Sequence, residues 1–269
     1  MVILVSLLVA AVVMAAAALI EPRLGPAAAG WVAALPVSFA VAVLAVMLDS
    51  GTGPASAMAL SAATHVPAQA VFGVVFATVL TRRGLLPGAA AGALAYGACS
   101  IALADVPASL AVTSALPLVA FAPRLMAGGR PRAGAPRRWR ATALMCAAAP
   151  ALVGAAVLTS RFAGPEAAGA VAAFPTVSTT LAIAVVTRDG PPAGAHALTG
   201  LVRSLPSYLV FCVVAAFAMP SAGLAAVVGG SVPARIWHDF MAPAVNPLPV
   251  APLPTPDQAR LSVPRRETR

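Results

Sequence analysis

A twelve-residue motif occurs twice in the chain, and it constrains the fold more than any other feature. Residues 25–36 are GPAAAGWVAALP and residues 164–175 are GPEAAGAVAAFP, identical at nine of twelve positions. Alanine matches carry little weight in such an alanine-rich chain. The shared Gly-Pro, Gly and closing Pro carry more, because each restricts the backbone in its own way.

The same offset of 139 positions extends well beyond the motif. It pairs Gly51 with Gly190 and Pro67 with Pro206 without a gap. A constant offset over about 90 residues indicates an internal duplication. The two copies are expected over roughly residues 2–103 and 141–237.

The composition places the chain in a membrane. Hydrophobic residues make up 60% of it and charged residues only 9%, too few charges to cover a soluble domain of this length. The net charge is +9 with no lysine. Because the arginines fall mostly between apolar runs, they indicate membrane topology and attraction to anionic lipid head groups rather than nucleic-acid binding. The lack of lysine is typical of a compositionally biased bacterial genome.

Nine apolar segments are predicted to cross a bilayer as helices, and the fifth of them is short. The first competes with a cleavable signal peptide, but it is the counterpart of residues 141–158, which favours a retained helix. The predicted fold is an all-α membrane bundle, in which two four-helix repeats are joined by an extra helix. The predicted spans are residues 2–20, 26–48, 55–80, 85–104, 107–122, 141–160, 165–186, 193–218 and 221–236.

Four regions follow from this pattern: a first membrane repeat, a linking helix with an arginine-rich loop, a second repeat and a proline-rich tail expected to be disordered. Their predicted bounds are 1–104, 105–140, 141–241 and 242–269. The stretch from Arg124 to Arg140 carries six arginines. It is interpreted as a solvated cytoplasmic loop that sets topology, with a lipid-head-group or partner site as the alternative.

The arginines predict the orientation. Placing the N-terminus outside and the C-terminus inside puts Arg82, Arg83 and the arginine-rich loop in the cytoplasm, as the positive-inside bias requires. Asp49 and Arg161 then share the outer side. Five helices separate the starts of the two repeats, so the second repeat is expected to be inverted. The expected location is a bacterial inner membrane.

Inverted repeats are a recurring plan among secondary transporters, whose sites lie where interrupted helices meet near the bilayer midplane. Prolines at matched positions predict such interruptions: Pro36 and Pro67 in the first copy, Pro175 and Pro206 in the second.

Two ionisable side chains lie within the predicted spans beside these prolines. Arg203 precedes Pro206 by three residues and His65 precedes Pro67 by two. A central arginine is costly in a membrane and is kept where it faces protein, water or an anion. Arg203 is therefore a candidate anion ligand and His65 a candidate titrating group. The alternative is structural: Arg203 hydrogen-bonds to carbonyls freed by the prolines, and His65 donates to a neighbouring helix.

Four polar residues could line the same place: Thr64, Gln69, Ser204 and Tyr208. Such side chains in lipid also serve as helix–helix contacts. There is no paired intramembrane carboxylate, nucleotide-binding loop or Cys/His cluster, so neither an enzyme, a metal nor a cofactor is expected.

Residues 168–217 contain a distinctive pattern: Phe174-Pro175, the turn Arg188-Asp189-Gly190, and Pro206 with Tyr208. Through this pattern, helices 165–186 and 193–218 resemble the GlpM-type family of small bacterial inner-membrane proteins. The first copy departs from it, with Leu35 in place of Phe and Gln69 opposite Tyr208. The resemblance implies a fused tandem version of a small protein that acts as an antiparallel pair, and it supplies no substrate.

Two functions are carried forward. The first is a secondary transporter or exporter of a small anionic or lipid-linked solute, through a site between the repeats. The alternative is a non-transporting membrane scaffold or accessory subunit that binds a membrane-protein partner through the arginine-rich loop and the tail.

Overall fold

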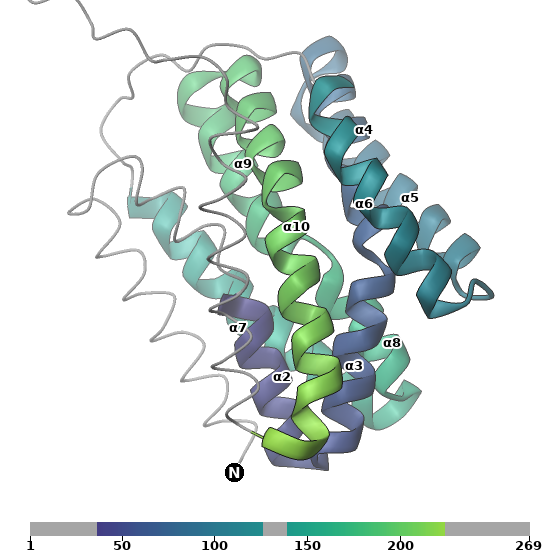
Figure 1. The fold of residues 1–269 in the computed structure, drawn as a ribbon. Coiled ribbons are helices and arrows are strands. Elements are labelled where there is room, and N and C mark those ends of the chain that lie inside the picture. The colour runs from purple at the N-terminus through teal and green to yellow at the C-terminus, as the bar shows by residue number, and fades with distance from the viewer. Residues whose placement is uncertain (1–36, 126–138, 224–269) are drawn as a thin grey trace, which may run out of the picture.

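The computed structural model describes residues 37–125 and 139–223, and every element in them is a helix (Figure 1). The all-helical prediction is confirmed for this part of the chain. The helices are α2 (Val37–Ser50), α3 (Thr52–Thr64), α4 (Val66–Arg83), α5 (Leu85–Leu103), α6 (Ala108–Leu125), α7 (Trp139–Ala163), α8 (Pro165–Ala173), α9 (Thr176–Asp189) and α10 (Pro191–Ala222).

Several described helices are long and apolar enough to cross a membrane. Three segments qualify directly: Leu85–Leu103, Pro165–Thr187 and Pro191–Ala222. The pair α3 and α4 forms a fourth if its two helices, bent by 44°, count as one span. The chain is therefore a helical membrane protein. Outside the described residues lie the predicted span 2–20, the first part of 26–48 with Pro36, nearly all of 221–236, residues 126–138 of the arginine-rich stretch, and the tail.

The arginine-rich stretch is shorter as a loop than predicted. Helix α6 continues to Leu125 and α7 already begins at Trp139. Arg124 and Arg140, taken as the ends of the loop, are therefore helical.

Single glycines separate four pairs of successive helices. Gly51, Gly84, Gly164 and Gly190 each stand alone between two helices, with φ between 86° and 95°. Their ψ values lie near 180°, a backbone region that is essentially restricted to glycine because it has no Cβ. Each junction therefore reverses or redirects the chain within one residue.

The helix boundaries repeat with the sequence offset. Adding 139 to the bounds of α2 gives those of α9, and adding 139 to the start of α3 and the end of α4 gives the start and end of α10. The dihedral angles at the junctions agree as well, with φ 95° and ψ 177° at Gly51 and φ 86° and ψ 174° at Gly190. The duplicated sequence thus produces the same succession of helices in the described parts of both copies.

Equivalent helices of the two copies run antiparallel at the centre of the bundle. In Figure 1, α10 passes beside α3 and α4 and runs in the opposite direction. Close contacts agree with this course, because residue numbers rise along α3 and α4 while those of their partners fall along α10. These contacts join Ser56 to Ala216, Gly73 to Val202, and Leu80 to Gly194.

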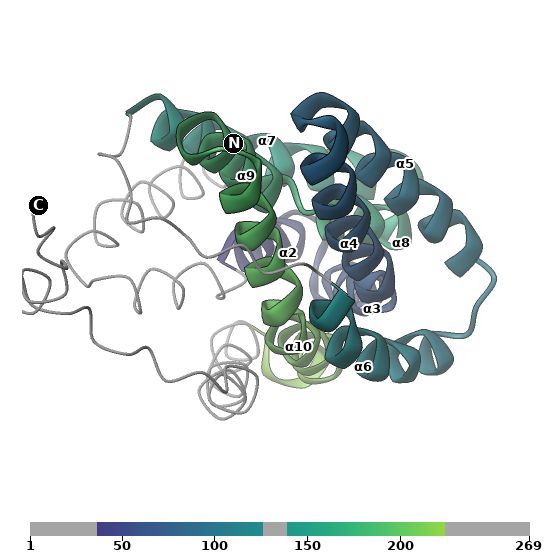
Figure 2. The same ribbon diagram turned by 90° about the horizontal axis from the view of Figure 1, so that it is seen from above.

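Helix α5 lies at the periphery against α4 (Figure 2). Its buried residues are Gly88, Gly92 and Tyr96, spaced by four, so a face with two glycines packs on α4. A Cβ added at Gly92 would lie 2.9 Å from the Cβ of Phe76, which shows how closely the helices approach. The opposite face exposes Leu94 and Ile101, consistent with contact with lipid.

Candidate functional site

Four of the predicted site residues, Thr64, His65, Gln69 and Tyr208, lie where α3 and α4 cross α10, beside the break in the first copy. Pro67 has no N–H and its ring excludes the carbonyl four residues earlier, so a continuous helix is disfavoured there. Helix α3 ends at Thr64. The His65 N–H donates a bifurcated hydrogen bond to the carbonyl oxygens of Ser61 and Ala62, with an N···O distance of 3.2 Å to each. The expected interruption at Pro67 is therefore present, with its bend at His65.

The His65 side chain is buried, with 9% of its surface exposed. Its Nδ1 lies 2.7 Å from the Ser61 carbonyl oxygen, which can only accept a hydrogen bond, so Nδ1 carries the proton. The Thr64 hydroxyl donates to the same carbonyl at 2.7 Å. His65 and Thr64 thus hold the end of α3, four residues or fewer away, rather than a neighbouring helix as the alternative expected. The other ring nitrogen of His65, Nε2, is not used by this bond.

Gln69 and Tyr208 occupy equivalent positions in the two copies and meet in the bundle. Gln69 is only 4% exposed. The Tyr208 hydroxyl lies close to Gln69 and Cys212, and its ring packs edge-on against Phe39 at 5.2 Å between centroids. Neither Gln69 Nε2 nor the Tyr208 hydroxyl has a hydrogen-bond partner, although both atoms are buried. Such groups are uncommon in folded proteins and call for an explanation.

Arg203 and Ser204 do not join this pair. Arg203 lies on α10 but is exposed, so it does not point into the contact between α4 and α10. The Ser204 hydroxyl donates to the Leu201 carbonyl of its own helix at 2.7 Å. Helix α10 also continues through Pro206, where a hinge was predicted.

The break at Pro175 separates α8 from α9. Phe174 N–H donates to the Val171 carbonyl and Thr176 N–H to the Phe174 carbonyl, so the Ala170 and Ala172 carbonyls lose their usual helical donors. Tyr96 of α5 donates its hydroxyl to Ala170 at 2.6 Å. The Tyr96 hydroxyl therefore gives the Ala170 carbonyl a donor in place of the N–H that it lost at the break.

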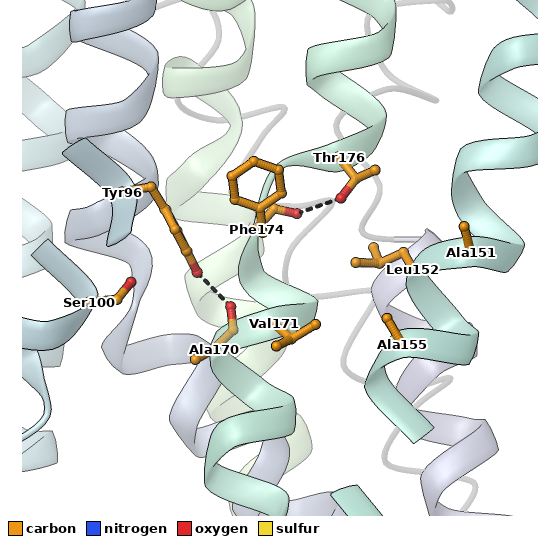
Figure 3. Close-up of a pocket in the computed structure, with 9 residues that line it drawn as sticks. All are labelled: Tyr96, Ser100, Ala151, Leu152, Ala155, Ala170, Val171, Phe174 and Thr176. Carbon is orange, nitrogen blue, oxygen red and sulfur yellow. Dashed lines mark hydrogen bonds between the residues drawn. The ribbon is translucent and has the colours of Figure 1, made fainter. Parts of the chain in front are cut away.

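A cavity of about 470 Å³ opens beside this break (Figure 3). Its walls are mostly apolar and come from α5, α7 and the α8–α9 junction. None of the side chains predicted from sequence lines it. A sequence signal for this cavity was the presence of Tyr96 inside an apolar span. A buried tyrosine hydroxyl needs a hydrogen-bond partner, and a carbonyl freed by a proline can supply one. The lining residues are Tyr96, Ser100, Ala151, Leu152, Ala155, Ala170, Val171, Phe174 and Thr176.

An ion pair ties α2 to α7 at one end of the bundle. Arg161 Nε donates to Asp49 Oδ2 at 2.8 Å, and its Nη2 contacts the other carboxylate oxygen. The hydrogen bond from Arg161 lowers the pKa of Asp49. The expectation that these two residues share one side of the membrane is consistent with this contact.

No protein-family model, curated protein or solved structure matches this chain. The resemblance to the GlpM-type family therefore stays a prediction from residues 168–217.

Proposed function

We propose that the protein is a secondary transporter built from inverted repeats, with its solute site where α3 and α4 cross α10. The observation that carries the proposal is the antiparallel course of equivalent helices. If α4 and α10 both cross the bilayer, the two copies have opposite orientations in it. This plan is shared by many secondary transporters, which bind solute between the repeats.

If the two copies are related by a local two-fold axis, the contacts indicate where that axis would lie. In the contacts between α3–α4 and α10, the paired residue numbers have nearly constant sums, between 272 and 275. A residue that faces its own equivalent 139 positions later would then lie at about position 67. Such an axis would pass close to Pro67 and Pro206, and Gln69 and Tyr208 would be two residues from it.

Interrupted helices also support transport. The described residues contain a break at His65 and another at Phe174-Pro175, both within apolar segments. Non-helical backbone at membrane depth is tolerated where it is buried in protein or lines a cavity, because its free polar groups need partners. The first break lies where α3 and α4 cross α10, and the second lies beside the cavity in Figure 3.

The solute expected from sequence was anionic or lipid-linked, mainly because of Arg203. Since Arg203 is exposed and apart from Gln69 and Tyr208, the proposed site does not depend on it. The proposed orientation remains N-terminus outside and C-terminus inside, in a bacterial inner membrane.

Cysteine labelling tests the inversion directly. Ser50→Cys and Asp189→Cys stand at equivalent helix ends, and they are introduced one at a time into a variant in which Cys99, Cys146 and Cys212 are serine or alanine. A membrane-impermeant maleimide applied to whole cells and to inverted vesicles should reach them from opposite sides. Labelling of both from the same side contradicts inverted repeats and, with them, the proposed transporter.

A further inference from the structure

The pair Gln69 and Tyr208 differs from three other buried polar side chains at the crossing. Those three donate to backbone carbonyls: Ser61 to Glu166, His65 to Ser61, and Thr199 to Ala195. Only Gln69 Nε2 and the Tyr208 hydroxyl are left over at this place. A buried donor without an acceptor destabilises the folded state unless something else supplies the acceptor.

The chemistry of the two groups defines what would satisfy them. The Gln69 amide nitrogen has two N–H donors and no acceptor, and the Tyr208 hydroxyl also has a proton to donate. A single hydrogen-bond-accepting oxygen beside the two groups would accept from both of them.

The charge of the surrounding side chains restricts the class of molecule that could bind these two groups. Among the residues whose burial the structure describes, the buried polar side chains are Ser61, His65, Gln69, Thr199 and Ser207, with no arginine and no carboxylate among them. The aromatic rings of Phe39 and Phe211 form an apolar wall beside Tyr208. An anion placed there would lose its hydration without gaining a counter-charge, a costly exchange in a low-dielectric interior.

We propose that Gln69 and Tyr208 are the solute-recognition pair, and that the solute is a small uncharged molecule with an accepting oxygen, such as an amide or a polyol. This inference rests on the proposed transporter function, and it changes the expected solute from an anion to a neutral molecule. The position of the pair next to the inferred two-fold axis would let one residue from each copy contact the same oxygen.

The test uses the full-length protein in proteoliposomes and three probes: glycerol and malonamide, which are neutral, and malonate, which has the carbon skeleton of malonamide and two negative charges. Uptake of a neutral probe should exceed that of protein-free vesicles. Gln69→Leu and Tyr208→Phe should each reduce it about fivefold, as expected for the loss of one hydrogen bond to the solute.

Matched controls remove polar groups that are satisfied within their own helix. Thr78→Val in α4 and Thr199→Val in α10 should leave uptake unchanged, because these hydroxyls bond to Val74 and Ala195. Tyr208→Phe removes an oxygen without a protein partner, so the variant is expected to fold normally.

The outcomes separate this inference from the proposed function. Malonate uptake that persists in Gln69→Leu and Tyr208→Phe overturns the neutral-solute inference and leaves a transporter. Neutral uptake that both variants retain overturns the role of this pair. Uptake of none of the probes by correctly inserted protein counts against both proposals and favours the scaffold alternative.

Discussion

Helices α3 and α4 in the first copy correspond to the single helix α10 in the second, yet one is broken and the other is not. Both contain a proline at the matched position, Pro67 or Pro206. They differ in the donors that precede it. In the first copy the His65 and Thr64 side chains both bond to the Ser61 carbonyl, whereas in the second Ser204 makes one short bond to Leu201. A proline permits a break, and neighbouring side chains decide whether the helix ends there.

The largest expected effect comes from a substitution that forces α4 away from α10. A Cβ at Gly73 of α4 would lie 2.5 Å from Val202 Cγ2 of α10, so Gly73→Leu should destabilise the protein by about 3 kcal/mol through overpacking. Unfolding in mixed detergent micelles measures the change. Gly200→Leu on α10 is the matched control, because nothing lies within 4 Å of its added Cβ. Equal losses in both variants would show that the contact between α4 and α10 is not tight.

The next test replaces His65, at the break, with serine, which is the residue at the equivalent position 204 of α10. His65→Ser removes the bond from Nδ1 to the Ser61 carbonyl and should cost about 1 kcal/mol. The bend of 44° should then decrease. Spin labels at the exposed positions 53 and 82 should move apart by about 3 Å, given the rise of a straight helix. Ser204→Ala should leave the course of α10 unchanged, and an unaltered distance in His65→Ser would assign the bend to Pro67 alone.

The smallest effect is expected at the ion pair, which has no sequence counterpart because Arg188 stands at the position equivalent to Asp49. The pKa of Asp49 is lowered by Arg161, so the pair stabilises the fold above the ordinary carboxyl pKa of about 3.9 and ceases to do so as the pH falls through the lowered value. Arg161→Gln should reduce the melting temperature slightly at pH 7. The difference from wild type should disappear in acid, and a difference that grows in acid would contradict this sign.

Much of the helical arrangement could be predicted from sequence. The predicted spans 85–104 and 193–218 differ by at most four residues at either end from α5 and α10, because glycine and charged residues delimit the apolar runs. The offset of 139 also anticipated the shared helix boundaries. These features depend on local backbone preferences and on hydrophobicity, which a single sequence carries.

The composition of the site was harder to predict. Helix α10 is apolar on nearly all sides, so its sequence gives no periodic signal to show which face is buried. Arg203 was therefore expected at the site, and the structure exposes it. The bond from Tyr96 to Ala170 joins residues 74 positions apart. It depends on how α5 packs beside the α8–α9 break, which no local pattern in the sequence encodes.

The four glycine junctions bear on how such a bundle can change shape. A connection of one residue leaves no slack, so the helices on either side of Gly51, Gly84, Gly164 or Gly190 must shift together. In most proteins loops absorb such movements, and helices remain rigid. In the segments that these glycines join, the compliant points lie inside the apolar helices, at His65 and at Phe174-Pro175. Those segments would bend in the middle of their helices rather than at their ends.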